Sequence, residues 1–367
     1  MTDQPPPPDI PMVVRVPPEP PIGERVPLPR PRRPRPGLLD GALLTIGFAI
    51  VLFGTIIVLV LAAFAWVAVT TGPDGLKATA GANDKSVASL PHFVAEVLAW
   101  SFPIAYAVGL AYALGVLWFV VGRGWAAQAG LARFPIAHFM LGLLALPGFI
   151  IVSDMLAKLL FWVFEMPPPD QPGELGDLFR PFHWSFAVIA VGICPGVVEE
   201  LWCRGFLGRG FIGRYGWAGG ILLTSLAFGM LHLYPVPYVL VTAVMGVGLH
   251  FTYAMSRSLW VPITIHVLNN SFAALVAVDA IPTGRMEQSL TDSPALVVSL
   301  ALALLVFAGL GMWTARGRVE VNPTDPVPIR GVMVPAGTGG IKDTRPKLLL
   351  VVAAAVCSGS LLWLLFG

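Results

Sequence analysis

Charged residues are scarce in this chain of 367 residues, and their scarcity argues against an ordinary soluble domain. Asp, Glu, Lys and Arg make up 12% of the sequence, whereas soluble domains average about 25%. Hydrophobic residues make up 56%, and the mean hydropathy is +0.77. Long apolar runs recur along most of the chain, as in proteins whose helices cross a bilayer. We therefore predict an all-α, polytopic integral membrane protein.

Cysteine is rare as well, and the first 36 residues have no apolar run. The three cysteines, Cys194, Cys203 and Cys357, all lie in apolar segments. An odd number without paired spacing argues against a disulfide framework or a zinc knuckle, so we interpret them as small buried hydrophobic residues. Residues 1–36 lack the apolar region of a signal peptide and are rich in Pro and Arg. We expect a disordered cytosolic tail there, with a docking site for a proline-binding module as the alternative.

Nine apolar stretches are long enough to span a bilayer. The fourth and fifth are the least clearly separated, because Gly and Arg are scattered between them. The stretches cover residues 42–69, 94–121, 136–164, 184–209, 217–234, 238–255, 259–279, 295–313 and 348–366. An internal repeat is not evident.

The distribution of Lys and Arg between the connecting segments predicts the orientation of the chain. With nine spans and a cytosolic N-terminus, most of the 23 basic residues fall on the cytosolic side, as the positive-inside rule requires. We expect the C-terminus on the outer side of a membrane that is the cytoplasmic membrane of a bacterium. The lipid bilayer is one expected partner, nucleic acid is not one, and the oligomeric state is not indicated.

Ionisable residues inside predicted spans gather in one part of the sequence, and the first group is "VVEELWCRG". Glu200 lies four residues before Arg204, which favours an ion pair along one helix face. Glu199 misses that alignment, so its partner must come from another helix. We expect the helix to continue past Arg204 to about Gly210. If it ended earlier, Glu199 would lie too far from His232, the nearest ionisable residue of the next predicted span.

Two further groups follow at helical spacing. In "FGMLH", Phe228 and His232 share one helix face, and in "HVLNN", His266 and Asn270 do. A carboxylate with a histidine can activate water, and a second histidine with an amide can stabilise an oxyanion. Taken singly, an intramembrane His is as well explained by packing, and a Glu–Arg pair by helix association. Glu96, His138, Lys158 and His250 lack such neighbours, and we interpret them as structural.

The three groups resemble known motifs. "PGVVEELWCRG" is similar to an EExxxR motif, "FGMLH" to FxxxH and "HVLNN" to HxxxN, in the family of CAAX prenyl endopeptidases and bacteriocin-processing enzymes called CPBP or Abi. The resemblance implies an intramembrane endopeptidase of the glutamate type, with a CAAX-protease-like helical core. It also implies a substrate that is a membrane-embedded or membrane-anchored polypeptide.

Carried over to this sequence, the resemblance implies a role for each motif residue. Glu199 would be the general base together with His232, and His266 and Asn270 would form the oxyanion hole. Glu200, Arg204 and Phe228 would support the site.

The domain organisation follows from this resemblance and from the apolar stretches. The expected parts are the tail 1–36, N-terminal transmembrane helices 37–183, the CPBP/CAAX-protease-like core 184–276, an additional transmembrane helix 277–313, a cytosolic loop 314–347 and a C-terminal transmembrane helix 348–367.

Three alternatives stay open. A catalytic zinc could be held by one Glu and two His, although no HExxH spacing is present and we expect no cofactor. A non-catalytic scaffold or immunity-type protein would keep the same fold without the reaction. A transporter would use the same groups as a proton relay, but transporters usually show repeated halves.

Overall fold

The computed structural model describes residues 36–80, 92–131, 134–167, 173–233, 235–316, 318–319, 341–342 and 346–366. Nearly all of the predicted Pro- and Arg-rich tail and most of the predicted loop 314–347 lie outside these residues. The described residues form helices and short connections, with one pair of two-residue strands. The all-α, polytopic fold class is therefore confirmed.

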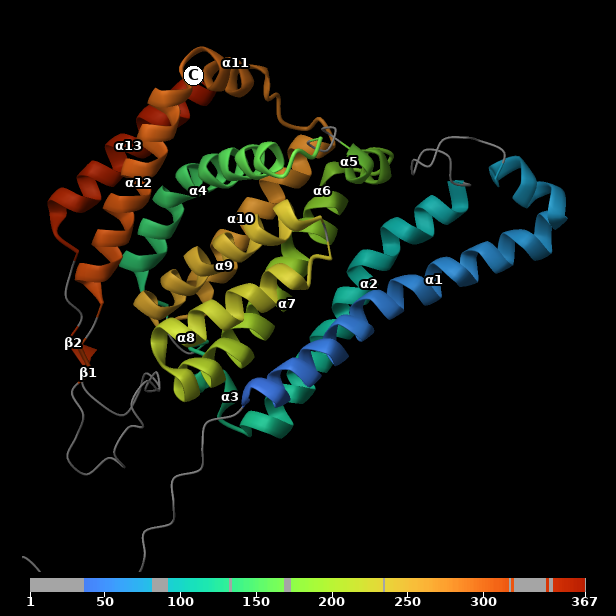
Figure 1. Ribbon diagram of the computed structural model, residues 1–367, viewed down its shortest axis with the longest axis horizontal. Helices are drawn as coiled ribbons and strands as arrows, with labels where there is room; N and C mark the ends of the chain where they lie inside the picture. Colours follow the sequence, from blue (N-terminus) through green and yellow to red (C-terminus); the bar gives the residue numbers. More distant parts are fainter. Residues whose placement is uncertain are drawn as a thin grey trace, which may run out of the picture. The chain divides into compact units, whose positions relative to one another are not determined.

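Figure 1 labels the α-helices and the strands, and three π-helical elements lie between them in the described part of the chain. In chain order the elements are α1 (Leu38–Ala80), α2 (His92–Val116), η2 (Leu117–Val121), α3 (Trp125–Gln128), α4 (Ile136–Val163), α5 (Gly173–Phe179), α6 (Trp184–Ala187), η3 (Val188–Ile193), α7 (Cys194–Glu200), η4 (Leu201–Gly208), α8 (Arg209–Met230), α9 (Val236–Ser256), α10 (Trp260–Ala277), α11 (Gly284–Asp292), α12 (Pro294–Ala315), β1 (Arg318–Val319), β2 (Ile341–Lys342) and α13 (Leu348–Phe366). The η elements are π-helical. The strands β1 and β2 pair antiparallel, with Arg318 opposite Lys342.

Among the described residues, eight helical segments are long and apolar enough to cross a membrane. The sequence predicted about nine, and the difference arises at Trp184–Met230, a segment of 47 residues that covers the fourth and fifth predicted spans. Gly216, with φ 79° and ψ 176°, interrupts the helical backbone inside this segment. A Cβ added to Gly220 would lie 2.5 Å from the backbone nitrogen of Ile212, which would be about 12 Å away in a continuous helix. The chain therefore folds back at Gly216.

The helices form three groups, one of which carries the three motifs. Helices α1 and α2 pack side by side along their length (Figure 1). Helices α4, α12 and α13 form a second group around a cluster that includes Ile151, Leu304 and Leu361. Helix α10 contacts α4, α7, η3 and α9, and α8 packs on α9. Helix α2 also contacts α7 and η3, so it lies against the segment that carries the first motif.

An aromatic cluster holds the first two helices against the motif-bearing segment. Trp202 is completely buried and stacks on Phe48 of α1, with ring centroids 4.7 Å apart and ring planes at 4°. Its indole N–H donates to Thr45 Oγ1 at 3.3 Å. Tyr112 of α2 lies 5.7 Å from the same indole ring. This packing fixes α2 beside the segment that carries the two glutamates.

The two glutamates lie on a short α-helical stretch between two π-helical stretches. Helix α7 has seven residues, with η3 before it and η4 after it. Pro195, at the start of α7, lacks the N–H that a regular helix would use, and the preceding π-helical turn accommodates this gap. Irregular turns of this kind are frequent at functional sites.

Candidate active site

The ion pair predicted between Glu200 and Arg204 is present and completely buried. Arg204 Nη1 donates to Glu200 Oε1 at 2.5 Å, and neither side chain has exposed surface. Arg204 Nη2 donates to the backbone oxygen of Gly246 on α9 at 2.8 Å. Each charge is therefore compensated, as a buried charge requires, and the pair also joins its own helix to α9.

Glu200 also contacts His266, which the spacing along one helix does not predict. Glu200 Oε1 lies 2.8 Å from His266 Nδ1. An ionised carboxylate only accepts hydrogen bonds, so Nδ1 of His266 carries a proton. In the neutral imidazole Nε2 is then an acceptor, and Nε2 donates only when the ring is an imidazolium.

Glu199 lies between side chains from two other helices and is hydrogen-bonded to one of them. The hydroxyl of Tyr106, on α2, donates to Glu199 Oε1 at 2.6 Å. Glu199 Oε2 lies 3.9 Å from Nε2 of His266, which exceeds hydrogen-bond distance. Among the described residues, Oε2 is buried and has no hydrogen-bond partner. Glu199 thus has one occupied oxygen and one oxygen available to a further molecule.

The ring of Phe228 contacts side chains of the other motif residues. Its ring lies edge-on to His232 and to His266, with centroids 4.9 Å and 5.7 Å away. On the same ring, Arg204 Cζ lies 4.9 Å from the centroid, within the range of a cation–π contact. These contacts bring residues of all three motifs around one aromatic side chain.

His232, just after α8, has a defined hydrogen bond on one ring nitrogen. Its Nδ1 lies 2.9 Å from the backbone oxygen of Phe228. A carbonyl only accepts, so Nδ1 is the donor, and Nε2 is the basic nitrogen of the neutral ring. A direct contact between His232 and Glu199 stays a prediction.

The continuation of the motif helix past Arg204 is confirmed. The helical backbone runs through η4 into α8 and is first interrupted at Gly216, so Glu199 lies about midway along the segment 184–215. The fold-back at Gly216 then returns Phe228 to the level of Arg204. The second motif is thereby brought back beside the first.

Asn270 is half-buried on α10, one turn after His266. The side-chain amide of Asn269 donates to Asn270 Oδ1 at 3.3 Å. The oxygen of Asn270 is therefore used as an acceptor, and its NH₂ group is the side available for donation. An available NH₂ group is what donation from Asn270 to an oxyanion requires. That role of Asn270 stays a prediction.

Most of the ionisable residues interpreted as structural have local contacts. Glu96 lies 3.5 Å from His92 one turn away, and Lys158 lies 2.8 Å from Asp154. His250 is completely buried and packs edge-on against Tyr253.

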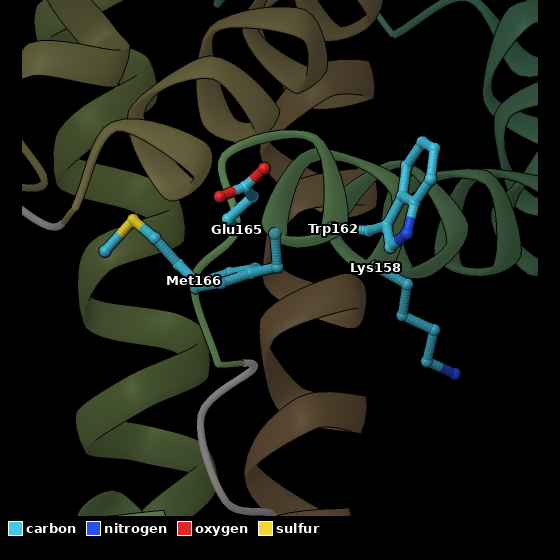
Figure 2. A pocket seen from close by; sticks show the side chains of 5 residues that line it. Lys158, Trp162, Glu165 and Met166 are labelled. Atoms are coloured by element: carbon cyan, nitrogen blue, oxygen red, sulfur yellow. The ribbon is translucent and has the colours of Figure 1, made fainter.

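Lys158 also lines a cavity of about 380 Å³ at the end of α4. Trp162, Glu165 and Met166 line it too (Figure 2), and Lys158 and Met166 point to opposite sides in that view. None of the motif residues lines this cavity, so it is separate from the candidate active site.

The zinc alternative requires three protein ligands around one point. Among the described residues, no group of three or more His, Cys, Asp or Glu side chains lies close enough together to hold a metal ion. We derive no step through a metal.

Tyr106 is the site residue that the sequence does not reveal. It lies in "SFPIAYAVGL", a stretch of ten residues without charge, and its partner is 93 positions away. The sequence gives one general indication of its role, because a tyrosine hydroxyl within a membrane span needs a hydrogen-bond partner.

One comparison with known families matches the segment that carries the site. Residues 181–272 match the family model described as type II CAAX prenyl endopeptidase Rce1-like. The matched segment is a quarter of the chain and includes all three motifs. No curated protein and no solved structure gives a significant match. The three motifs, the membrane-spanning helices and the matched segment therefore agree in one respect: residues 181–272 are similar to CAAX-type intramembrane proteases.

Proposed function

We propose that this protein is an endopeptidase that hydrolyses a peptide bond of a membrane-embedded or membrane-anchored polypeptide. The observation that supports this most directly is the environment of Glu199. Its side chain is 11% exposed, and its Oε2 has no hydrogen-bond partner among the described residues. A carboxylate placed in this way is available to take a proton from a water molecule.

In the proposed reaction the water lies against Glu199 Oε2 and the imidazole of His232. Glu199 takes a proton while the water oxygen bonds to the substrate carbonyl carbon, which becomes a tetrahedral oxyanion. The C–N bond then breaks, and the proton passes to the leaving nitrogen, so the products are a carboxylic acid and an amine. His232 suits the role of helper because its Nδ1 donates to Phe228 and leaves Nε2 as the basic atom.

His266 and Asn270 are the proposed donors to the oxyanion. Donation from His266 requires the imidazolium form, because its Nδ1 proton is already directed at Glu200. With Glu199 and Glu200 ionised, the imidazolium and Arg204 make this four-residue group electrically neutral. A neutral group is the less costly arrangement in a medium of low dielectric constant. Donors fixed in this way stabilise a developing negative charge without rearranging.

The proposal includes the surroundings of the reaction. The membrane is that of a bacterial cell, with the N-terminus in the cytosol and the C-terminus outside, as the distribution of basic residues favours.

No metal is part of the proposed site, so cleavage should persist after incubation of the purified protein with a chelator. Loss of cleavage that added zinc restores would contradict this part. A prenylated protein is one candidate substrate, because the matched family is described as a CAAX prenyl endopeptidase.

The test compares Glu199→Gln with Glu200→Gln and with the wild type. Each protein is expressed in the same cells, and the membrane fraction is analysed by quantitative proteomics of peptide termini. We expect Glu199→Gln to abolish the new termini while the protein stays folded, as judged by its thermal unfolding in detergent. If all three proteins produce the same termini at the same rate, the protease proposal is wrong and a non-catalytic role with the same fold is favoured.

A further inference from the structure

The contact between Tyr106 and Glu199 comes from outside the segment that the family model matches. Tyr106 lies on α2, whereas the match covers residues 181–272. The Tyr106 hydroxyl is 2.6 Å from Glu199 Oε1, which is the usual distance of a hydrogen bond from a hydroxyl to an ionised carboxylate. None of the three motifs includes this residue.

The hydrogen bond makes the two oxygens of Glu199 unequal. Oε1 accepts from Tyr106, while Oε2 is the oxygen that lies 3.9 Å from His266 Nε2. Without the bond to Tyr106, the carboxylate would be able to rotate and exchange its two oxygens. A general base must be held within hydrogen-bond reach of the proton that it removes.

We infer that Tyr106 is a positioning residue for the proposed hydrolysis, whose hydroxyl holds Glu199 so that Oε2 faces the reacting water. This inference rests on the proposed function. Tyr106 acts through Glu199, and no contact between Tyr106 and the substrate is needed.

The position of Tyr106 is itself determined by packing. Tyr106 is half-buried and packs against the same apolar cluster as Trp202. Six residues later on α2, Tyr112 donates to the backbone oxygen of Leu44 at 3.0 Å, which ties α2 to α1. Helix α2 is thus held on both sides, and the hydroxyl of Tyr106 is brought to Glu199 with little freedom to move.

Tyr112 provides a matched control, because it is a half-buried tyrosine of the same helix whose hydroxyl bonds to a backbone oxygen. The test uses purified full-length protein with Tyr106→Phe and Tyr112→Phe. The probe is an internally quenched peptide with a farnesylated Cys-aliphatic-aliphatic-X end, together with any substrate found by the terminal proteomics. A hydrogen bond to a charged group contributes roughly 1.5–3 kcal/mol, so we expect kcat to fall about 10- to 100-fold in Tyr106→Phe. KM and thermal unfolding should stay as in Tyr112→Phe.

A second readout does not depend on cleavage. The difference between infrared spectra of the wild type and Glu199→Gln identifies the carboxylate band of Glu199. We expect Tyr106→Phe to shift this band and Tyr112→Phe to leave it unchanged. An unshifted band, or equal kcat in the two Phe variants of an active enzyme, overturns the inference. A shifted band in a protein that cleaves nothing supports the contact and refutes the proposed function instead.

Discussion

Glu200 Oε1 lies 2.8 Å from His266 Nδ1, so the second glutamate of the motif orients the histidine that faces the first. The same oxygen accepts from Arg204. Glu200 therefore does more than neutralise the charge of Arg204 inside the membrane. It joins the EExxxR motif on α7 and η4 to the HxxxN motif on α10, and the two bonded residues lie 66 positions apart.

The first prediction concerns the stability of Glu200→Gln. This change leaves Arg204 as a buried charge without its counter-charge, and removal of one partner from a buried ion pair costs about 3–5 kcal/mol. Glu199 makes no hydrogen bond to Arg204 in its own helix, so Glu199→Gln serves as the matched control. We expect a clearly lower unfolding temperature in detergent for Glu200→Gln than for Glu199→Gln. Equal unfolding temperatures would show that the buried pair does not contribute to stability.

The second prediction concerns the proposed oxyanion hole. Loss of one donor to an oxyanion typically lowers kcat by about 10²–10³-fold, and we expect Asn270→Leu to reduce cleavage by this amount. Asn269→Leu is the control, because Asn269 is the adjacent residue of the same type and contacts Asn270 only through Oδ1. Its effect should be at least tenfold smaller. If Asn269→Leu reduced kcat as much as Asn270→Leu, the oxyanion role of Asn270 would be refuted.

How much of the site the sequence predicts depends on how far apart the partners lie. The pair of Glu200 with Arg204, and Phe228 beside His232, follow from spacing of four residues on one helix. The contacts of Glu199 with Tyr106 and of Glu200 with His266 depend on how separate helices pack, and no local pattern encodes them. The sequence also identifies the helical class and most of the spans, because apolar length alone is informative in a membrane.

The fold-back in the fourth span is the part of the fold that the sequence indicates least clearly. The stretch "GRYGWAGG" contains several glycines, and spacing does not show which of them interrupts the helix. In the structure only Gly216 within this stretch takes a positive φ, of 79°. Gly219 and Gly220 are helical, and Gly220 instead allows close approach of the Ile212 backbone.

The third prediction tests this turn. A non-glycine residue with the φ and ψ of Gly216 is strained by about 1–3 kcal/mol, so Gly216→Ala should lower the unfolding temperature. An added Cβ meets nothing within 4 Å there, so the effect would come from the backbone. Gly54→Ala on α1 is the control, since Gly54 is helical and its Cβ also meets nothing within 4 Å. We expect Gly54→Ala to be neutral or stabilising, and equal losses in both variants would contradict the prediction.

The fourth prediction concerns the two ends of the membrane-spanning region. If the chain crosses the membrane once before the fold-back at Gly216 and once after it, the total number of membrane crossings is odd. The two ends of the chain then lie on opposite sides of the membrane. In a variant whose three native cysteines are replaced by Ala, single cysteines at Leu38 and Phe366, at the ends of α1 and α13, can be labelled with a membrane-impermeant maleimide in intact cells and in inverted vesicles. We expect Phe366→Cys to be labelled in intact cells and Leu38→Cys only in inverted vesicles. Labelling of both from the same side would mean that Trp184–Met230 makes a single crossing, and the predicted outer position of the C-terminus would be wrong.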